Sequence, residues 1–168
     1  MLARKAVPWR GSGTVRITVG PAPLRETNFM SDKAFLDTNV LVYAHEPATG
    51  TKHERARALI EQLWITGGGV LSTQVLQELC INLRRKMSKP WTAEETRNVI
   101  LDYMNWQIVV NRPDSIIEAL VIENRYRISF WDALIIHAAE SSEASILYTE
   151  DLSDGQEYGS VRVVNPFK

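Results

Sequence analysis

Short apolar runs alternate with amphipathic stretches along most of the chain. Each run fits a buried parallel strand; the runs stand at 34–36, 70–71, 108–110, 146–148 and 161–164. Between them, apolar residues recur at helical spacing, as in 53–64 and 75–83. Strands that alternate with helices predict an α/β fold, with a mostly parallel sheet covered by helices on both faces.

Capping signals mark where several of these helices should begin. Thr92 and Glu95 have the spacing of a capping box, which predicts a helix running to about Asn105. Pro113 suits a first helical turn, and Ser129 can cap the helix that follows it. The polar stretch between the last two apolar runs, DLSDGQEYG, is predicted to be a loop.

Four carboxylates stand within otherwise apolar stretches: Asp37, Glu78, Asp132 and Asp151. Asp37 and Asp151 follow predicted strands, and the other two lie in the first turns of predicted helices. Ligands collect at the carboxyl ends of the strands in such a fold, so all four could point into one crevice. Carboxylates without basic partners repel one another unless cations neutralise them, and an oxygen-only ligand set selects Mg²⁺ or Mn²⁺. The set therefore predicts a metal site suited to phosphate chemistry.

Each acid alone also has an ordinary explanation. Asp37 could cap the turn after its strand, and Glu78 could be a solvated flank of an apolar helix face. Asp132 lies three residues after Ser129, which is capping-box spacing. Asp151 lies in a polar loop where acids are common. The prediction of a metal site therefore depends on the whole set.

Length and composition favour one cytoplasmic domain. The chain has 168 residues, 45% of them hydrophobic, which is enough for one core. Its single cysteine, Cys80, excludes a disulfide framework and gives no sign of a zinc cluster. No apolar run is long enough to cross a bilayer. These features predict a cytoplasmic protein without a membrane segment.

Residues 1–30 differ from the rest of the chain in charge and amino-acid composition. They hold five basic residues against one acidic residue, a net +4, and leave a net −5 for residues 31–168. Pro and Gly interrupt every periodicity in this segment, so we expect a disordered extension outside the fold. A transit peptide, or a true start at Met30, are the alternatives. The domain predicted to fold spans 31–168.

The ordered set of motifs resembles the PIN-domain ribonucleases, especially the VapC-type toxins of toxin–antitoxin pairs. The resemblance covers about residues 33–168. The matching pieces, in order, are Asp37-Thr38-Asn39 after a strand, Glu78 on a helix, Phe130-Trp131-Asp132-Ala133-Leu134, and Thr149-Glu150-Asp151 after the next strand. No single piece is specific, whereas the ordered four-part set is.

The resemblance implies a three-layer α/β/α sandwich and a Mg²⁺- or Mn²⁺-dependent endoribonuclease. It also implies an RNA substrate, a homodimer and a cognate antitoxin protein. Asp37, Glu78, Asp132 and Asp151 would be the catalytic, metal-binding quartet, with Asn39 and Thr149 in support. Many members carry a further acid soon after the fourth, and the candidate here, Asp154, lies three residues on.

Other interpretations remain open beside this one. Arg84 and Arg85 end a predicted helix about two turns after Glu78, where they could grip a phosphate or simply be solvated. Asn82, one turn after Glu78, could steady its carboxylate. A phosphotransferase or receiver domain fits less well, because Asn39 stands where such proteins need a second aspartate. The alternative from another class is a non-catalytic module that binds RNA or protein.

Overall fold

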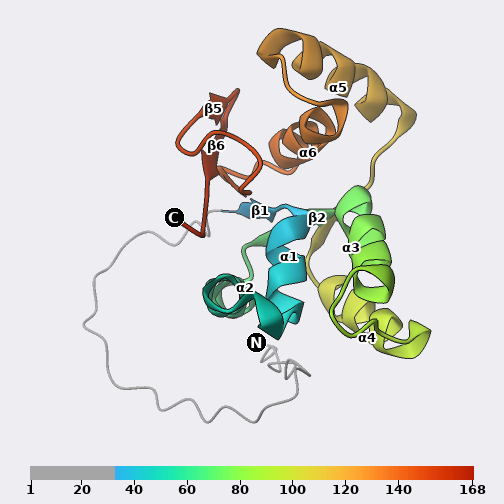
Figure 1. The fold of residues 1–168 in the computed structure, drawn as a ribbon. Coiled ribbons are helices and arrows are strands. Elements are labelled where there is room, and N and C mark those ends of the chain that lie inside the picture. Colours follow the sequence, from blue (N-terminus) through green and yellow to red (C-terminus); the bar gives the residue numbers. More distant parts are fainter. Residues whose placement is uncertain (1–32) are drawn as a thin grey trace, which may run out of the picture.

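The computed structural model describes residues 33–168 (Figure 1). The predictions for residues 1–30, including the alternative start at Met30, lie outside the described residues.

Within residues 33–168, six strands form one sheet, in the order β3-β2-β1-β4-β6-β5. Their bounds are β1 Ala34–Leu36, β2 Gly69–Ser72, β3 Gln107–Val109, β4 Ile146–Tyr148, β5 Glu157–Tyr158 and β6 Val161–Val164. All neighbouring strands are parallel except β5 and β6, which are antiparallel. Phe35 in β1 pairs with Val70 on one side and Leu147 on the other. The prediction of a mostly parallel sheet is confirmed.

Helices cover both faces of this sheet. Their bounds are α1 Thr38–His45, α2 Thr51–Thr66, α3 Thr73–Arg85, α4 Ala93–Tyr103, α5 Pro113–Tyr126 and α6 Phe130–Ser141, with a 3-10 turn, η1, at Pro47–Thr49. In Figure 1, α1 to α4 lie on one side of the sheet, and α5 and α6 lie on the other. Helix α6 contacts β2, β4 and β6, whereas α5 packs against α6. The three-layer α/β/α sandwich is confirmed.

The capping signals act as predicted. Thr92 Oγ1 accepts a hydrogen bond from the Glu95 amide, and the Thr92 amide donates to the Glu95 carboxylate at 2.8 Å. Ser129 caps α6, and Pro113 is the first residue of α5. The helix predicted to reach Asn105 ends at Tyr103 instead.

One strand was missed. Strand β5 lies within the stretch predicted to be a loop, and it turns back into β6 through Gly159, whose φ is +58°. A two-residue strand offers no alternation for a sequence pattern to detect. This hairpin extends the sheet by one antiparallel edge strand.

Close packing in the core depends on one glycine. A Cβ on Gly69 in β2 would lie 2.4 Å from the Trp106 ring, well inside van der Waals contact. Trp106 in turn packs against Trp64 and Tyr103 on the same side of the sheet. The aromatic cluster therefore reaches the strand only because residue 69 has no side chain.

Helix α5 exposes apolar side chains. Four of its residues, Ile116, Ile117, Leu120 and Val121, are between 47% and 61% exposed. Their spacing places them on one stripe of the helix, away from α6. Among the described helices, none is both long enough and apolar enough to cross a membrane.

Candidate active site

The carboxyl ends of β1 and β4 meet at the centre of the sheet. Leu36 pairs with Tyr148, so Asp37 and Thr149 emerge side by side. The chain leaves β1 toward β2 on one side and later returns to β4 on the other side. Such a reversal of strand order is where α/β proteins bind ligands. The sequence prediction placed its acidic residues near this point.

Asp37 is the most enclosed of the predicted carboxylates. Only 9% of the residue is exposed, and it forms the N-cap of α1. Its Oδ1 accepts from the Thr38 amide at 2.6 Å, and its Oδ2 accepts from Thr149 Oγ1 at 2.8 Å. Two strand ends and a helix start therefore hold this carboxylate in one orientation.

Burial raises the pKa of Asp37 from 3.8 to about 6. The hydrogen bonds from Thr149 and Thr38 lower this pKa in part, and the negative charges of Asp151 and Glu78 raise it further. Asp151 and Glu78 are thus each close enough to Asp37 to act on it electrostatically. At neutral pH the ionised Asp37 is unfavourable in this position unless a cation compensates its charge.

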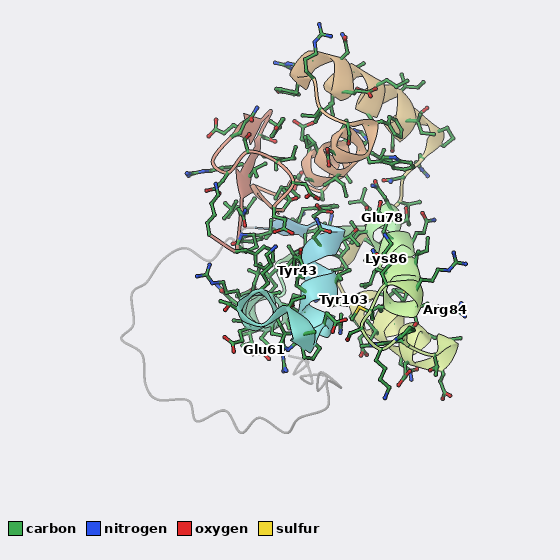
Figure 2. The ribbon with its side chains drawn as sticks, in the orientation of Figure 1. Tyr43, Glu61, Glu78, Arg84, Lys86 and Tyr103 are labelled. Atoms are coloured by element: carbon green, nitrogen blue, oxygen red, sulfur yellow. The ribbon has the colours of Figure 1, made fainter. Side chains whose placement is uncertain are left out.

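Glu78 lies on α3 and is held at both oxygens. Its Oε2 accepts from Thr38 Oγ1 at 2.7 Å, and its Oε1 accepts from Gln74 Nε2 at 3.0 Å. Figure 2 shows Glu78 on the upper part of α3. Thr38 therefore joins two predicted site acids, because its amide binds Asp37 and its hydroxyl binds Glu78. The prediction that Asn82 would steady Glu78 is wrong, since within residues 33–168 no hydrogen bond joins them.

Asp151 is the exposed member of the group. Its Oδ2 accepts from Asn39 Nδ2 at 2.6 Å, and its amide donates to Thr149 Oγ1 at 3.1 Å. Thr149 therefore donates to Asp37 and accepts from the Asp151 amide, which connects these two acids. The structure gives Asn39 and Thr149 contacts that suit the supporting role predicted for them.

The fourth predicted acid, Asp132, has a different partner. The Asp132 Oδ2 accepts a hydrogen bond from Ser129 Oγ at 2.7 Å, and the Asp132 amide donates a hydrogen bond to Ser129 Oγ. Within the described part of the chain, no hydrogen bond links Asp132 to the other three acids. The structure thus shows the capping arrangement, and the metal-binding role of Asp132 stays a prediction.

The remaining predicted residues lie at the margins. Asp154 accepts from the Asn165 amide at 2.9 Å, which is the main reason its pKa is lowered, and it faces Lys168 Nζ at 3.5 Å. Arg84 and Arg85 are exposed near the end of α3, and Figure 2 shows Arg84 further along the helix than Glu78. Over residues 33–168 neither arginine forms a salt bridge.

The donor chemistry of the site fits a hard divalent cation. Asp37, Glu78 and Asp151 offer oxygen only, the ligand type that Mg²⁺ and Mn²⁺ prefer. No Lys, Arg or His of the described chain forms a salt bridge with any of them. However, no three Asp, Glu, His or Cys side chains in that part of the chain are close enough together to enclose an ion. The three acids therefore have the right chemistry, without a closed cage around a cation.

Sequence reasoning missed Thr38 and Gln74 as partners of Glu78. Gln74 precedes Glu78 by four residues, so helical spacing alone could have indicated that hydrogen bond. Thr38 is forty residues away in sequence, and only the packing of α1 against α3 brings its hydroxyl to Glu78.

Comparison with known proteins identifies the fold. The family model described as "PIN domain" matches residues 34–153. No functionally curated sequence matches the chain. A toxin–antitoxin complex from Klebsiella pneumoniae has a similar structure, with 16% identity and a TM-score of 0.60, over 81% of this chain and 99% of that one.

Two further solved structures are similar. A sarcin–ricin-loop-cleaving VapC toxin from Mycobacterium tuberculosis has 18% identity and a TM-score of 0.52, over 71% of this chain and 92% of that one. DNA-bound VapBC from Salmonella typhimurium has 18% identity and a TM-score of 0.55, over 78% of this chain and 96% of that one. At these identities the likeness concerns the fold.

Proposed function

The chain belongs to the PIN-domain family, and from this we propose that it is a divalent-metal-dependent endoribonuclease and the toxin half of a toxin–antitoxin pair. The observation that carries the proposal is the position of Asp37. This carboxylate is buried at the sheet's reversal point, beside two further acids, and no basic side chain among residues 33–168 forms a salt bridge with it. A non-catalytic module gains nothing from keeping such charges together.

We assign the site residues by their surroundings. Asp37 and Asp151 would hold the cation directly, because they flank the ends of adjacent strands. Glu78 would hold the cation or orient the attacking water, since its carboxylate is fixed from two sides. Asp132 completes the set by family resemblance alone. When bound, Mg²⁺ or Mn²⁺ would neutralise these acids, activate water as the nucleophile and stabilise the leaving oxygen.

The chain's own residues would orient these groups. Thr149 and Thr38 fix the carboxylate of Asp37, and Asn39 fixes that of Asp151. Arg84 and Arg85, exposed on the same helix as Glu78, would attract the phosphates of RNA toward the site. Hydrolysis by water would leave a 5′-phosphate and a 3′-hydroxyl.

Incubation of the purified protein with structured RNA tests the activity. Cleavage should require Mn²⁺ or Mg²⁺, stop with chelator, and disappear in Asp37→Asn, with unchanged far-UV circular dichroism as the folding control. Wild-type protein that leaves every RNA intact in Mn²⁺, or cuts equally in chelator, would contradict the proposal. In the first case the non-catalytic binding module becomes the better explanation.

The proposed partners are a cognate antitoxin and a second copy of this chain. The proposed compartment is the cytoplasm. The similar solved structures include toxin–antitoxin complexes, which supports the first partner by analogy of fold. A small gene for a DNA-binding protein next to this gene, whose product co-purifies with the chain and suppresses cleavage, is the expected result. Light scattering of the purified protein would test the dimer.

A further inference from the structure

Glu150, in the loop that follows β4, forms a hydrogen-bond network of its own. Glu150 lies between Thr149 and Asp151, and its side chain is 20% exposed. Its Oε1 accepts from the Tyr43 hydroxyl and its Oε2 from Lys52 Nζ, both at 2.5 Å. Lys52 also donates to the Tyr43 hydroxyl at 3.2 Å. Glu150 therefore has a hydrogen-bond donor at each oxygen.

Aromatic packing encloses this network. The Tyr43 ring meets the Phe167 ring edge-on, with centroids 5.1 Å apart. Lys52 Nζ lies 4.5 Å from the Tyr43 centroid and 5.4 Å from the Phe167 centroid, which is cation–π distance. Figure 2 shows Tyr43 on α1, near α2. Helices α1 and α2 thus each supply a donor to Glu150, and Phe167 near the C-terminus packs against both donors.

The charges within the network are matched. The hydrogen bond to Glu150 is the main reason that the pKa values of Tyr43 and Lys52 are raised. Burial acts to raise the pKa of Glu150, but the hydrogen bonds from Lys52 and Tyr43 lower it overall. The ammonium group of Lys52, 2.5 Å from Oε2, compensates the charge of Glu150. Glu150 is not a further metal acid, although it adjoins Asp151.

The loop is fastened to α1 at three consecutive residues. Thr149 donates to Asp37, Glu150 accepts from Tyr43, and Asp151 accepts from Asn39. Asn39 and Tyr43 are four residues apart, so they lie on the same face of the helix. The bonds to Asp37 and Asn39 involve the site itself, whereas the bonds to Glu150 lie outside it.

We propose that Tyr43 and Lys52, acting through Glu150, are positioning residues that fix the loop carrying Asp151 and so set the affinity for a divalent cation. The metal-affinity part rests on the proposed function. Thr149 is held by its buried bond to Asp37, whereas within residues 33–168 the Asp151 side chain is held only by the exposed bond from Asn39, which joins two short side chains. Among the described residues, Glu150 is therefore the nearest partly buried anchor for the part of the loop that carries Asp151. Loss of the anchor should leave the acids in place but Asp151 poorly oriented.

Two substitutions separate positioning from charge. Tyr43→Phe removes one hydroxyl, retains the ring packing against Phe167 and changes no charge. Glu150→Gln removes the ion pair with Lys52. The matched control is Glu61→Gln, which breaks the 3.2 Å Arg57–Glu61 pair on α2, outside the site.

Calorimetric titration of each variant with MnCl₂ measures the first consequence. Partners that orient metal ligands typically change metal affinity by about 10–100-fold, so we expect about tenfold weaker binding for Tyr43→Phe and Glu150→Gln. Glu61→Gln should bind as the wild type does. Thermal unfolding identifies any variant that is simply unfolded.

Hydrogen exchange at the Asp151 amide measures the second consequence without metal. This amide donates to Thr149 Oγ1, and it should exchange at least about tenfold faster in Tyr43→Phe than in the wild type. Wild-type metal affinity together with wild-type exchange in Tyr43→Phe would overturn the positioning role. If the wild type itself binds no Mn²⁺, the proposed function fails, and the exchange rates alone decide whether the anchor fixes the loop.

Discussion

Asp37→Asn removes a buried negative charge while retaining the shape of the side chain, so the substitution should stabilise the metal-free protein at neutral pH. The side chain lies at the N-cap of α1, and Asn is a good N-cap residue. Its Oδ1 can still accept from the Thr38 amide, and its Nδ2 can donate to Thr149 Oγ1 in place of the present bond. The main change is therefore the loss of charge.

The raised pKa gives the size of the effect. The pKa of Asp37 rises from 3.8 to about 6 on folding, and each unit corresponds to about 1.4 kcal/mol. Ionised Asp37 thus costs about 3 kcal/mol above pH 6, whereas below pH 3.8 it is protonated in both states and costs nothing. Neutral hydrogen bonds are weaker than charged ones, which reduces the expected gain in Asp37→Asn to about 2 kcal/mol.

A buried histidine hides this effect in the wild type. Burial, then the charges of His53 and Arg57, lower the pKa of His45 from 6.5 to about 4. Its contribution to stability is present above pH 6.5 and is lost as the pH falls toward 4. Asp37 changes stability by a similar amount in the opposite direction over the same range. The wild type should therefore vary little between pH 4 and pH 6.5, whereas Asp37→Asn should lose stability on acidification.

Urea denaturation in chelator, at intervals from pH 4 to pH 8, measures this comparison. The free energy of unfolding of Asp37→Asn should exceed that of the wild type by about 2 kcal/mol at pH 7.5, with the difference shrinking toward pH 4. Addition of Mn²⁺ at pH 7.5 should stabilise the wild type alone. A difference that does not vary with pH, or an Asn variant that is less stable at pH 7.5, would refute the assignment of a raised pKa to Asp37.

Three further substitutions test the fold, each by urea denaturation. Glu46 accepts hydrogen bonds from the Ser88 amide at 2.7 Å and from the Ser88 hydroxyl at 2.8 Å. Glu46→Ala should therefore lower the free energy of unfolding by about 1–3 kcal/mol, and an unchanged value would mean that other contacts hold Ser88 in place. Gly69→Ala pushes a methyl group into Trp106 and should cost about 1–3 kcal/mol, with altered Trp fluorescence; a silent substitution would show that the ring moves freely. Arg127→Gly should stabilise by about 0.5–1 kcal/mol, because residue 127 ends α5 with φ of 57°, and a destabilised variant would indicate an unrecognised role for the arginine.

The main features of the fold could be predicted because local signals agree with tertiary structure. The predicted run 34–36 coincides with β1, and Thr92 and Ser129 cap the helices they were expected to cap. Strands β1 and β2 are buried along their whole length, as is typical of a parallel sheet with helices on both faces. Strand β5 could not be predicted, because its two residues form a strand only through pairing with β6.

The site could be predicted less completely, because sequence gives candidates and not their distances. Strand-end positions correctly indicated that Asp37 and Asp151 would lie near each other. Asp132 could be read from the sequence either as a metal ligand or as the partner of Ser129 in a capping box. The structure shows the bond to Ser129. The partners of Glu150 lie on α1 and α2, far away in the sequence, so nothing in the local sequence TED indicated them.

Both edge strands of the sheet are short. Strand β3 forms one edge with three residues, and β5 forms the other with two. A neighbouring chain could therefore add only two or three residues of backbone pairing at either edge, too few for a stable extended sheet. Stable association would have to rely on side chains, such as the bare aliphatic stripe along α5, and the molecule is thereby protected from open-ended stacking through its backbone.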